Sequence, residues 1–195
     1  MYSSDFISEV EKYVKLLLKE NLRKEMVFHN IDHTVNVVEQ CRILGSHYKL
    51  SGTDKTVLLT AAWFHDTGYC NGNISHEEQS VKIAFDFLNG WHVTPLYLSI
   101  VENLIMTTKL PAKPLTLLEE ILCDADMHHL GSPDYGTWCL LLKKELEFLR
   151  GTKILASEWA KQNKSFFISH HYFTEIAKTL WENQKQENFF GLADR

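Results

Sequence analysis

The chain has 195 residues, of which 45% are hydrophobic and 23% are charged, and its formal net charge is -5. This length suits one domain, and the composition is that of an ordinary globular protein rather than a disordered, fibrous or membrane-embedded one. The negative charge excludes a broad basic surface able to neutralise polymeric nucleic acid, although a bound cation could still attract a small anionic substrate. We therefore expect one domain over residues 1–195 and no nucleic-acid polymer as a partner.

The N-terminal stretch and the cysteines indicate where the protein works. Residues 6–18 are amphipathic and carry two Glu and two Lys, unlike a signal peptide or a transmembrane span. The four cysteines are scattered and follow neither a zinc-ribbon nor a disulfide pattern. We expect a cytoplasmic protein with no membrane partner; a homo-oligomer is left open.

Apolar residues recur at spacings of three and four along almost the whole chain, which predicts an all-α fold. Thr94-Pro95 is typical of a helix start, and Ser75 and Thr116 each precede a Glu at the capping-box spacing. The expected helices cover residues 4–20, 32–49, 53–66, 75–89, 95–108, 116–130, 135–149, 152–162 and 168–186.

Two histidines and an aspartate fall where these helices bury their apolar faces. His33 follows Asp32 at the start of the second helix and shares a face with apolar residues three and four positions apart. For one isolated histidine, a buried core role is the commoner explanation. His65 and Asp66 end the third helix after the apolar run 57–64, and an Asp there must be paired, hydrogen-bonded or bound to metal. A capping or salt-bridged Asp66 is the alternative.

Asp126 completes the set of candidate ligands. It shares a face of the sixth helix with Leu118, Leu122 and His129, whereas Asp124, two positions earlier, faces elsewhere. His33, His65, Asp66 and Asp126 together offer a mixed nitrogen and oxygen set suited to Mn²⁺, Fe²⁺, Co²⁺, Ni²⁺ or Zn²⁺, with Mg²⁺ also open. Such an ion lowers the pKa of a water ligand to about 7 and polarises a phosphoryl oxygen, which favours hydrolysis.

The order His33, His65-Asp66, Asp126, with intervals of 32 and 60 residues, resembles the signature of the HD superfamily of metal-dependent phosphohydrolases. Residues 28–34, 62–69, 76–80 and 122–126 are similar to a bacterial group of small predicted HD hydrolases. The likeness spans about 25–135. It implies an HD-domain helical bundle with additional C-terminal helices packed on it, acting on a small phosphorylated molecule such as a nucleotide.

The resemblance also suggests roles around the metal. Asp66 is expected in catalysis as well as binding, and His76 and Glu77 would orient the ligands or protonate a leaving oxygen, unless they merely open a helix. His29 and Asn30 are expected to contact substrate or to support the metal ligands. Lys109 stands where relatives often carry a histidine and suits a substrate phosphate. Only two histidines lie between Asp66 and Asp126, which predicts one metal per chain.

The leading hypothesis is therefore a metal-dependent phosphohydrolase. The first alternative is a nucleotide-binding or sensor protein that keeps the metal pocket but turns over little substrate. A second is a di-iron oxygenase on the same scaffold, which the shortage of histidines disfavours. The sequence alone does not choose the substrate or the physiological metal.

Overall fold

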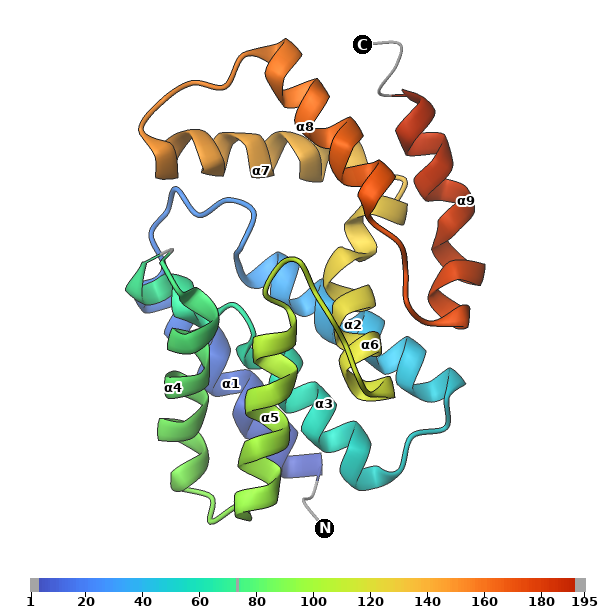
Figure 1. Cartoon of the computed structure of the whole chain (residues 1–195). Coiled ribbons are helices and arrows are strands. Elements are labelled where there is room, and N and C mark those ends of the chain that lie inside the picture. Colours follow the sequence, from blue (N-terminus) through green and yellow to red (C-terminus); the bar gives the residue numbers. More distant parts are fainter. Residues whose placement is uncertain (1–3, 73, 192–195) are drawn as a thin grey trace.

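The computed structural model describes residues 4–72 and 74–191, and over these residues all the regular secondary structure is helical (Figure 1). The α-helices are α1 (Ser4–Asn21), α2 (Ile31–His47), α3 (Gly52–Phe64), α4 (His76–Asn89), α5 (Pro95–Thr107), α6 (Leu117–Asp126), α7 (Tyr135–Arg150), α8 (Ala156–Ser169) and α9 (Glu175–Gly191). Two 3₁₀ segments follow α3 and α6: η1 (Thr67–Asn71) and η2 (Met127–Gly131). The prediction of an all-α fold is confirmed.

Helix α3 lies at the centre of the bundle. Residues 56–64 are buried without interruption, so most of this helix is enclosed on every side by other helices. It packs against α1, α2, α4, α5 and α6, and the main core forms around it. The end of α3 therefore lies deep in the protein, and the polar residues that follow Phe64 begin there.

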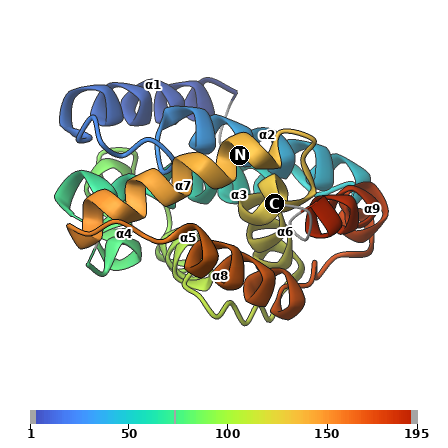
Figure 2. The ribbon, with the colours of Figure 1, turned by 90° about the horizontal axis from the view of Figure 1, so that it is seen from above.

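The C-terminal helices form a second layer over one end of this bundle. Figures 1 and 2 show α7 and α8 crossing that end, with α9 beside α6. Phe167 of α8 joins Leu130 and Tyr135 in a small separate core. Helix α9 packs on η2, where a Cβ on Gly131 would lie only 2.6 Å from Cβ of Trp181. The layer thus contacts the segment that follows α6 directly.

Several expected helix boundaries were wrong. The helix predicted over 116–130 ends at Asp126 and tightens into η2, a 3₁₀ continuation of the kind common at helix ends. The helices expected over 152–162 and 168–186 are α8 and α9, shifted toward the C-terminus. Thr174 accepts a hydrogen bond from the Ala177 amide at 3.2 Å, a cap that sets the true start of α9.

The helix starts at residues 94, 116 and 75 had different outcomes. The caps at Thr94 and Thr116 are confirmed, and Thr116 forms a full capping box with Glu119. Ser75 makes no side-chain cap and has a left-handed backbone with φ of 52°, so its predicted capping box was wrong. The chain enters α4 through this turn, which places His76 and Glu77 at the first two helical positions.

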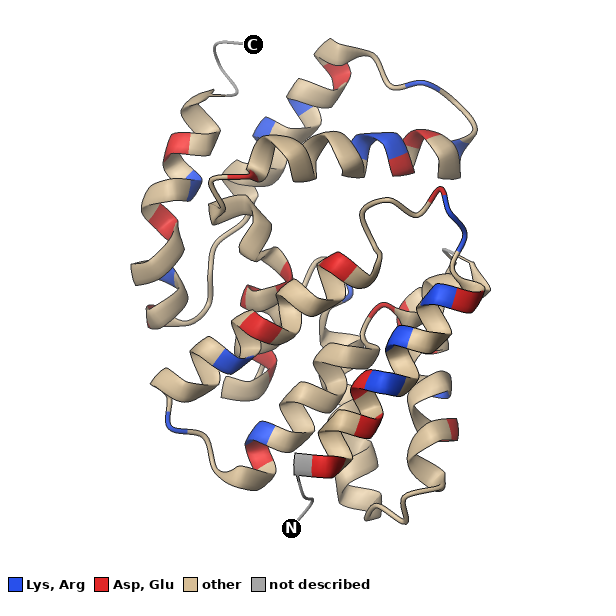
Figure 3. Cartoon of the chain, turned by 180° about the vertical axis from the view of Figure 1, so that it is seen from behind, with Lys and Arg blue, Asp and Glu red and all other residues tan. Residues whose placement is uncertain are grey.

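Charges on the helices are mixed in sign. On the face drawn in Figure 3, basic and acidic residues are interleaved along α1, and Lys12 and Lys15 lie 2.6 Å from Glu9 and Glu11. In the part of the chain that the structure describes, no helix is long and apolar enough to cross a bilayer.

Candidate metal centre

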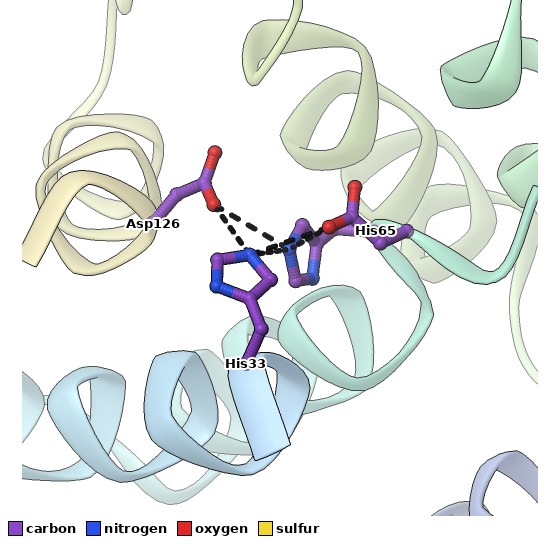
Figure 4. Close-up of side chains that lie close together, drawn as sticks. His33, His65 and Asp126 are labelled. Atoms are coloured by element: carbon purple, nitrogen blue, oxygen red, sulfur yellow. Dashed lines mark hydrogen bonds and ion pairs between the residues drawn. The ribbon is translucent and has the colours of Figure 1, made fainter. Parts of the chain in front are cut away.

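Four side chains from three parts of the bundle meet at one point. His33 comes from the first turn of α2, His65 and Asp66 from the end of α3, and Asp126 from the end of α6. One ligand atom from each lies within 4.8 Å of the others. Figure 4 shows His33 and His65 with their imidazoles turned toward each other and Asp126 facing them from α6.

The distances describe a tight cluster. His33 Nε2 lies 3.1 Å from Asp126 Oδ1 and 3.3 Å from Asp66 Oδ2. His65 Nε2 lies 3.1 Å from Asp66 Oδ2, 3.6 Å from Asp126 Oδ1 and 3.4 Å from His33 Nε2. Both imidazoles thus present the same nitrogen to the same pair of carboxylates.

Local backbone contacts fix these orientations. The Asn30 side chain accepts hydrogen bonds from the amides of Asp32 and His33, which caps α2 and sets its first turn. His65 Nδ1 lies 2.8 Å from the Ala62 carbonyl oxygen and donates to it, which turns Nε2 toward the cluster. The sequence places His65 one residue past the helix, where its ring can fold back to this carbonyl.

The charges of the cluster stabilise one another. Burial disfavours every charged form, but the two carboxylates outweigh it and raise the pKa of His33 and, more strongly, of His65. In the same way, and again against burial, the imidazoles lower the pKa of Asp66 and Asp126. At neutral pH both carboxylates are therefore ionised.

A divalent cation fits this donor set. Asp66 Oδ2 is buried near both imidazole nitrogens, yet it makes no hydrogen bond of acceptable geometry within the described structure. A buried carboxylate oxygen without a hydrogen bond is costly, and metal coordination removes that cost. Two imidazoles and two carboxylates match the preferences of Mn²⁺, Fe²⁺, Co²⁺, Ni²⁺ and Zn²⁺.

The cluster opens into a cavity of about 450 Å³. Its walls include both carboxylates of the cluster and four other residues proposed from the sequence: His29, His76, Glu77 and Lys109. Asn30 does not line this cavity, because its side-chain amide caps α2 and donates to the Val27 carbonyl. Apolar side chains complete the walls, among them Phe28, Leu110, Met127 and Leu142.

Three rings stack along one wall of the cavity. Tyr69 lies between His29 and His76, with ring centroids 4.4 and 4.2 Å away and interplanar angles of 20° and 21°. His76 Nε2 is 3.6 Å from Asp66 Oδ1. The stack therefore holds both imidazoles beside the cluster of His33, His65, Asp66 and Asp126.

Two charged groups border this wall. Glu77 is buried, and its Oε2 lies 3.6 Å from His76 Nδ1. Lys109 is half-exposed and pairs with Glu78 at 2.6 Å. A weak pair of this kind leaves the ammonium group able to turn toward an anion in the cavity.

Sequence reasoning missed Tyr69 and Glu145. Tyr69 lies within the HD-like segment 62–69, but its stack depends on η1, a 3₁₀ turn that helical periodicity does not predict. Glu145 of α7 is fully buried and reaches His29 across the chain. A signal was present, because Glu145 lies on the apolar line of Leu142, Leu146 and Leu149, where an unpaired carboxylate would be costly.

Asp124 does not belong to the cluster. It is buried, and its two oxygens accept hydrogen bonds from the amides of Phe173 at 2.7 Å and Thr174 at 2.8 Å. Burial raises its pKa to about 6. The expectation that Asp124 faces away from the four clustered residues therefore agrees with the structure, where it anchors the segment before α9.

Comparison with known proteins identifies the family. The HD domain model matches residues 30–130, more than half of the chain, and the chain belongs to the HD domain family. Its fold is similar to the crystal structure of a Lactobacillus plantarum protein, with a TM-score of 0.73 and 16% identity over 100% of this chain and 96% of that one.

A second structure, described as a predicted HD superfamily hydrolase from an uncultured Thermotogales bacterium, has a TM-score of 0.62 and 16% identity. The match covers 94% of this chain and 89% of that one. At this identity the two structures show the shared fold alone. No curated protein matches the chain.

Proposed function

We propose that this HD-domain protein is a metal-dependent phosphohydrolase that acts on a phosphoester of a small molecule, with nucleotides as the substrate class. The observation that carries the proposal is the buried cluster of His33, His65, Asp66 and Asp126, which opens into a cavity large enough for a small ligand. The description of a similarly folded protein as a predicted HD superfamily hydrolase supports it.

The four clustered residues would hold one divalent cation per chain. Such an ion supplies an activated water and withdraws charge from the phosphoryl group. Asp66 is held at the boundary between cluster and cavity, with Oδ2 toward the imidazoles and Oδ1 toward His76. In this position Asp66 orients a nucleophile as well as binding the ion.

The remaining residues act on the substrate. His76 lies 3.6 Å from both Asp66 and Glu77, so either neighbour can support a proton that His76 delivers to the leaving oxygen. At the rim of the cavity, Lys109 would break its ion pair with Glu78 and bind a phosphate oxygen of the substrate. His29 faces the same cavity. Asn30 contributes by holding the first turn of α2, and with it His33.

The test is a metal-resolved activity screen. Chelated protein is reloaded separately with Mn²⁺, Co²⁺, Ni²⁺, Fe²⁺, Zn²⁺ or Mg²⁺ and offered nucleoside mono-, di- and triphosphates and cyclic nucleotides. We expect metal-dependent release of phosphate or opening of a cyclic ester, lost in Asp66→Asn and retained in Asp86→Asn, which removes an exposed carboxylate from α4. Stoichiometric metal binding without turnover of any substrate would contradict the proposal.

A further inference from the structure

Glu145 is a fully buried carboxylate that belongs to α7, outside the part of the chain matched by the HD domain model. Its Oε2 accepts hydrogen bonds from the amides of Phe28 at 2.8 Å and His29 at 3.1 Å. Its Oε1 makes a short hydrogen bond with His29 Nδ1. Three donors from two adjacent residues therefore converge on one side chain of a helix more than a hundred residues away.

These contacts fix the His29 imidazole from two directions. A buried carboxylate is tolerated only when its oxygens are hydrogen-bonded, and here both are. Because the carboxylate accepts, Nδ1 of His29 carries a proton. The opposite edge of the ring carries Nε2, and the Tyr69 ring covers one face at 4.4 Å. The ring plane and the proton on Nδ1 are thus both set before a ligand arrives.

His29 lines the cavity beside Asp66, and its side chain is 19% exposed. An imidazole that donates Nδ1–H to a carboxylate and Nε2–H to a phosphate is positively charged, and such charge-assisted bonds are about twice as strong as neutral ones. Glu145 compensates that charge within the protein. The pair therefore favours an anion over a neutral ligand.

We propose that Glu145 is a positioning residue that holds His29 with Nδ1 toward α7, so that Nε2 donates a hydrogen bond to the substrate phosphate. The inference rests on the proposed phosphohydrolase function and extends the phosphate site to α7. A carboxylate that served only to satisfy the two amides would not need the bond to the imidazole. That third bond is what couples α7 to the cavity.

A double-mutant cycle tests whether Glu145 acts through His29. The probe is inorganic phosphate, titrated calorimetrically into Mn²⁺-loaded wild type, His29→Ala, Glu145→Gln and the double variant. In Glu145→Gln the amide oxygen still accepts from both backbone amides, while its NH₂ group faces Nδ1 and leaves a neutral ring. We expect phosphate affinity to fall roughly tenfold as the charge-assisted bond becomes neutral. The double variant should bind no more weakly than His29→Ala alone.

Glu147→Gln is the matched control. Glu147 lies on the same helix and also accepts from a backbone amide, that of Ile154 at 3.0 Å, and from Lys153 at 2.8 Å. Its substitution should leave phosphate affinity unchanged. Far-UV circular dichroism and the urea midpoint of each variant establish that it is folded.

Nuclear magnetic resonance of ring nitrogens gives an independent reading of wild-type Mg²⁺-loaded protein. We expect His29 Nδ1 to be protonated with and without phosphate, and the Nε2 resonance to shift when phosphate binds. An unprotonated Nδ1, or an Nε2 resonance that phosphate does not move, would overturn the inference even if Glu145→Gln failed to fold. Equal phosphate affinity in wild type and Glu145→Gln, or a further loss from Glu145→Gln in the His29→Ala background, would also overturn it.

These measurements need no turnover, so the two proposals can fail separately. Coupling between His29 and Glu145 without hydrolysis of any phosphoester would remove the hydrolase proposal and leave the phosphate site. Hydrolysis without coupling would remove the role of Glu145 alone.

Discussion

Gly68 lies in η1 where this segment passes against the start of α4, and replacing it with Ala should displace that helix. A Cβ at position 68 would lie 1.9 Å from the His76 carbonyl oxygen and 2.9 Å from the Ser80 amide nitrogen. Ordinary contact begins near 3.4 Å, so the segments must separate by more than 1 Å. The hydrogen bond from the Gly68 amide to Ser80 Oγ, 2.8 Å long, would break or stretch as they do.

The expected cost combines overpacking with the lost hydrogen bond, and together they amount to about 2–4 kcal/mol of the free energy of unfolding. Urea denaturation followed by circular dichroism measures it. Gly52→Ala is the control, because nothing lies within 4 Å of its Cβ and the substitution should be neutral or stabilising by up to about 1 kcal/mol. Since α4 carries His76, Gly68→Ala should also reduce activity in the fraction that remains folded. Equal stability of the two variants would refute the reasoning.

Three further predictions concern the metal, acid stability and the rim of the cavity. Mn²⁺ should raise the melting temperature of the wild type but not of Asp66→Ala, because a ligand stabilises only the state that binds it. Burial, aided by Lys185, lowers the pKa of His170 to about 3, so the unfolded chain binds a proton at this residue that the folded protein does not as pH falls below about 6.5; this residue should account for a loss of about 2 kcal/mol of the free energy of unfolding between pH 7 and 5. His170→Gln should remove that part of the pH dependence. Lys109→Ala should raise KM several-fold while leaving the melting temperature within about 1 °C, since its exposed pair with Glu78 adds little stability.

Each of these predictions has a contrary outcome that is simple to observe. A metal-induced rise in the melting temperature of Asp66→Ala would place the ion elsewhere. If His170→Gln loses as much stability as the wild type between pH 7 and 5, the buried imidazole does not control this pH dependence. His47→Gln, which removes an exposed imidazole, serves as the control. An unchanged KM in Lys109→Ala would remove this lysine from the phosphate site.

The helices that could be predicted from the sequence are those whose signals are local. The run 57–64 is apolar except for Thr60 and is buried within α3, and the caps at Thr94 and Thr116 depend on atoms within three residues. Polar residues that fall on the apolar face of a predicted helix, such as His33 and Asp126, are among those that the structure brings together. Local propensity failed where distant packing sets the boundary, as at η2, which Trp181 approaches closely.

The sequence by itself predicted an all-α chain and singled out the four clustered residues, because helical periodicity makes a buried histidine or aspartate conspicuous and because their order resembles the HD signature. Only the tertiary structure decided that Tyr69 stacks between His29 and His76, and that Glu145 reaches His29 from α7. These contacts join residues far apart in the sequence, and they depend on how one helix layer lies across another. No spacing along the chain encodes that placement, because side-chain packing between layers fixes it.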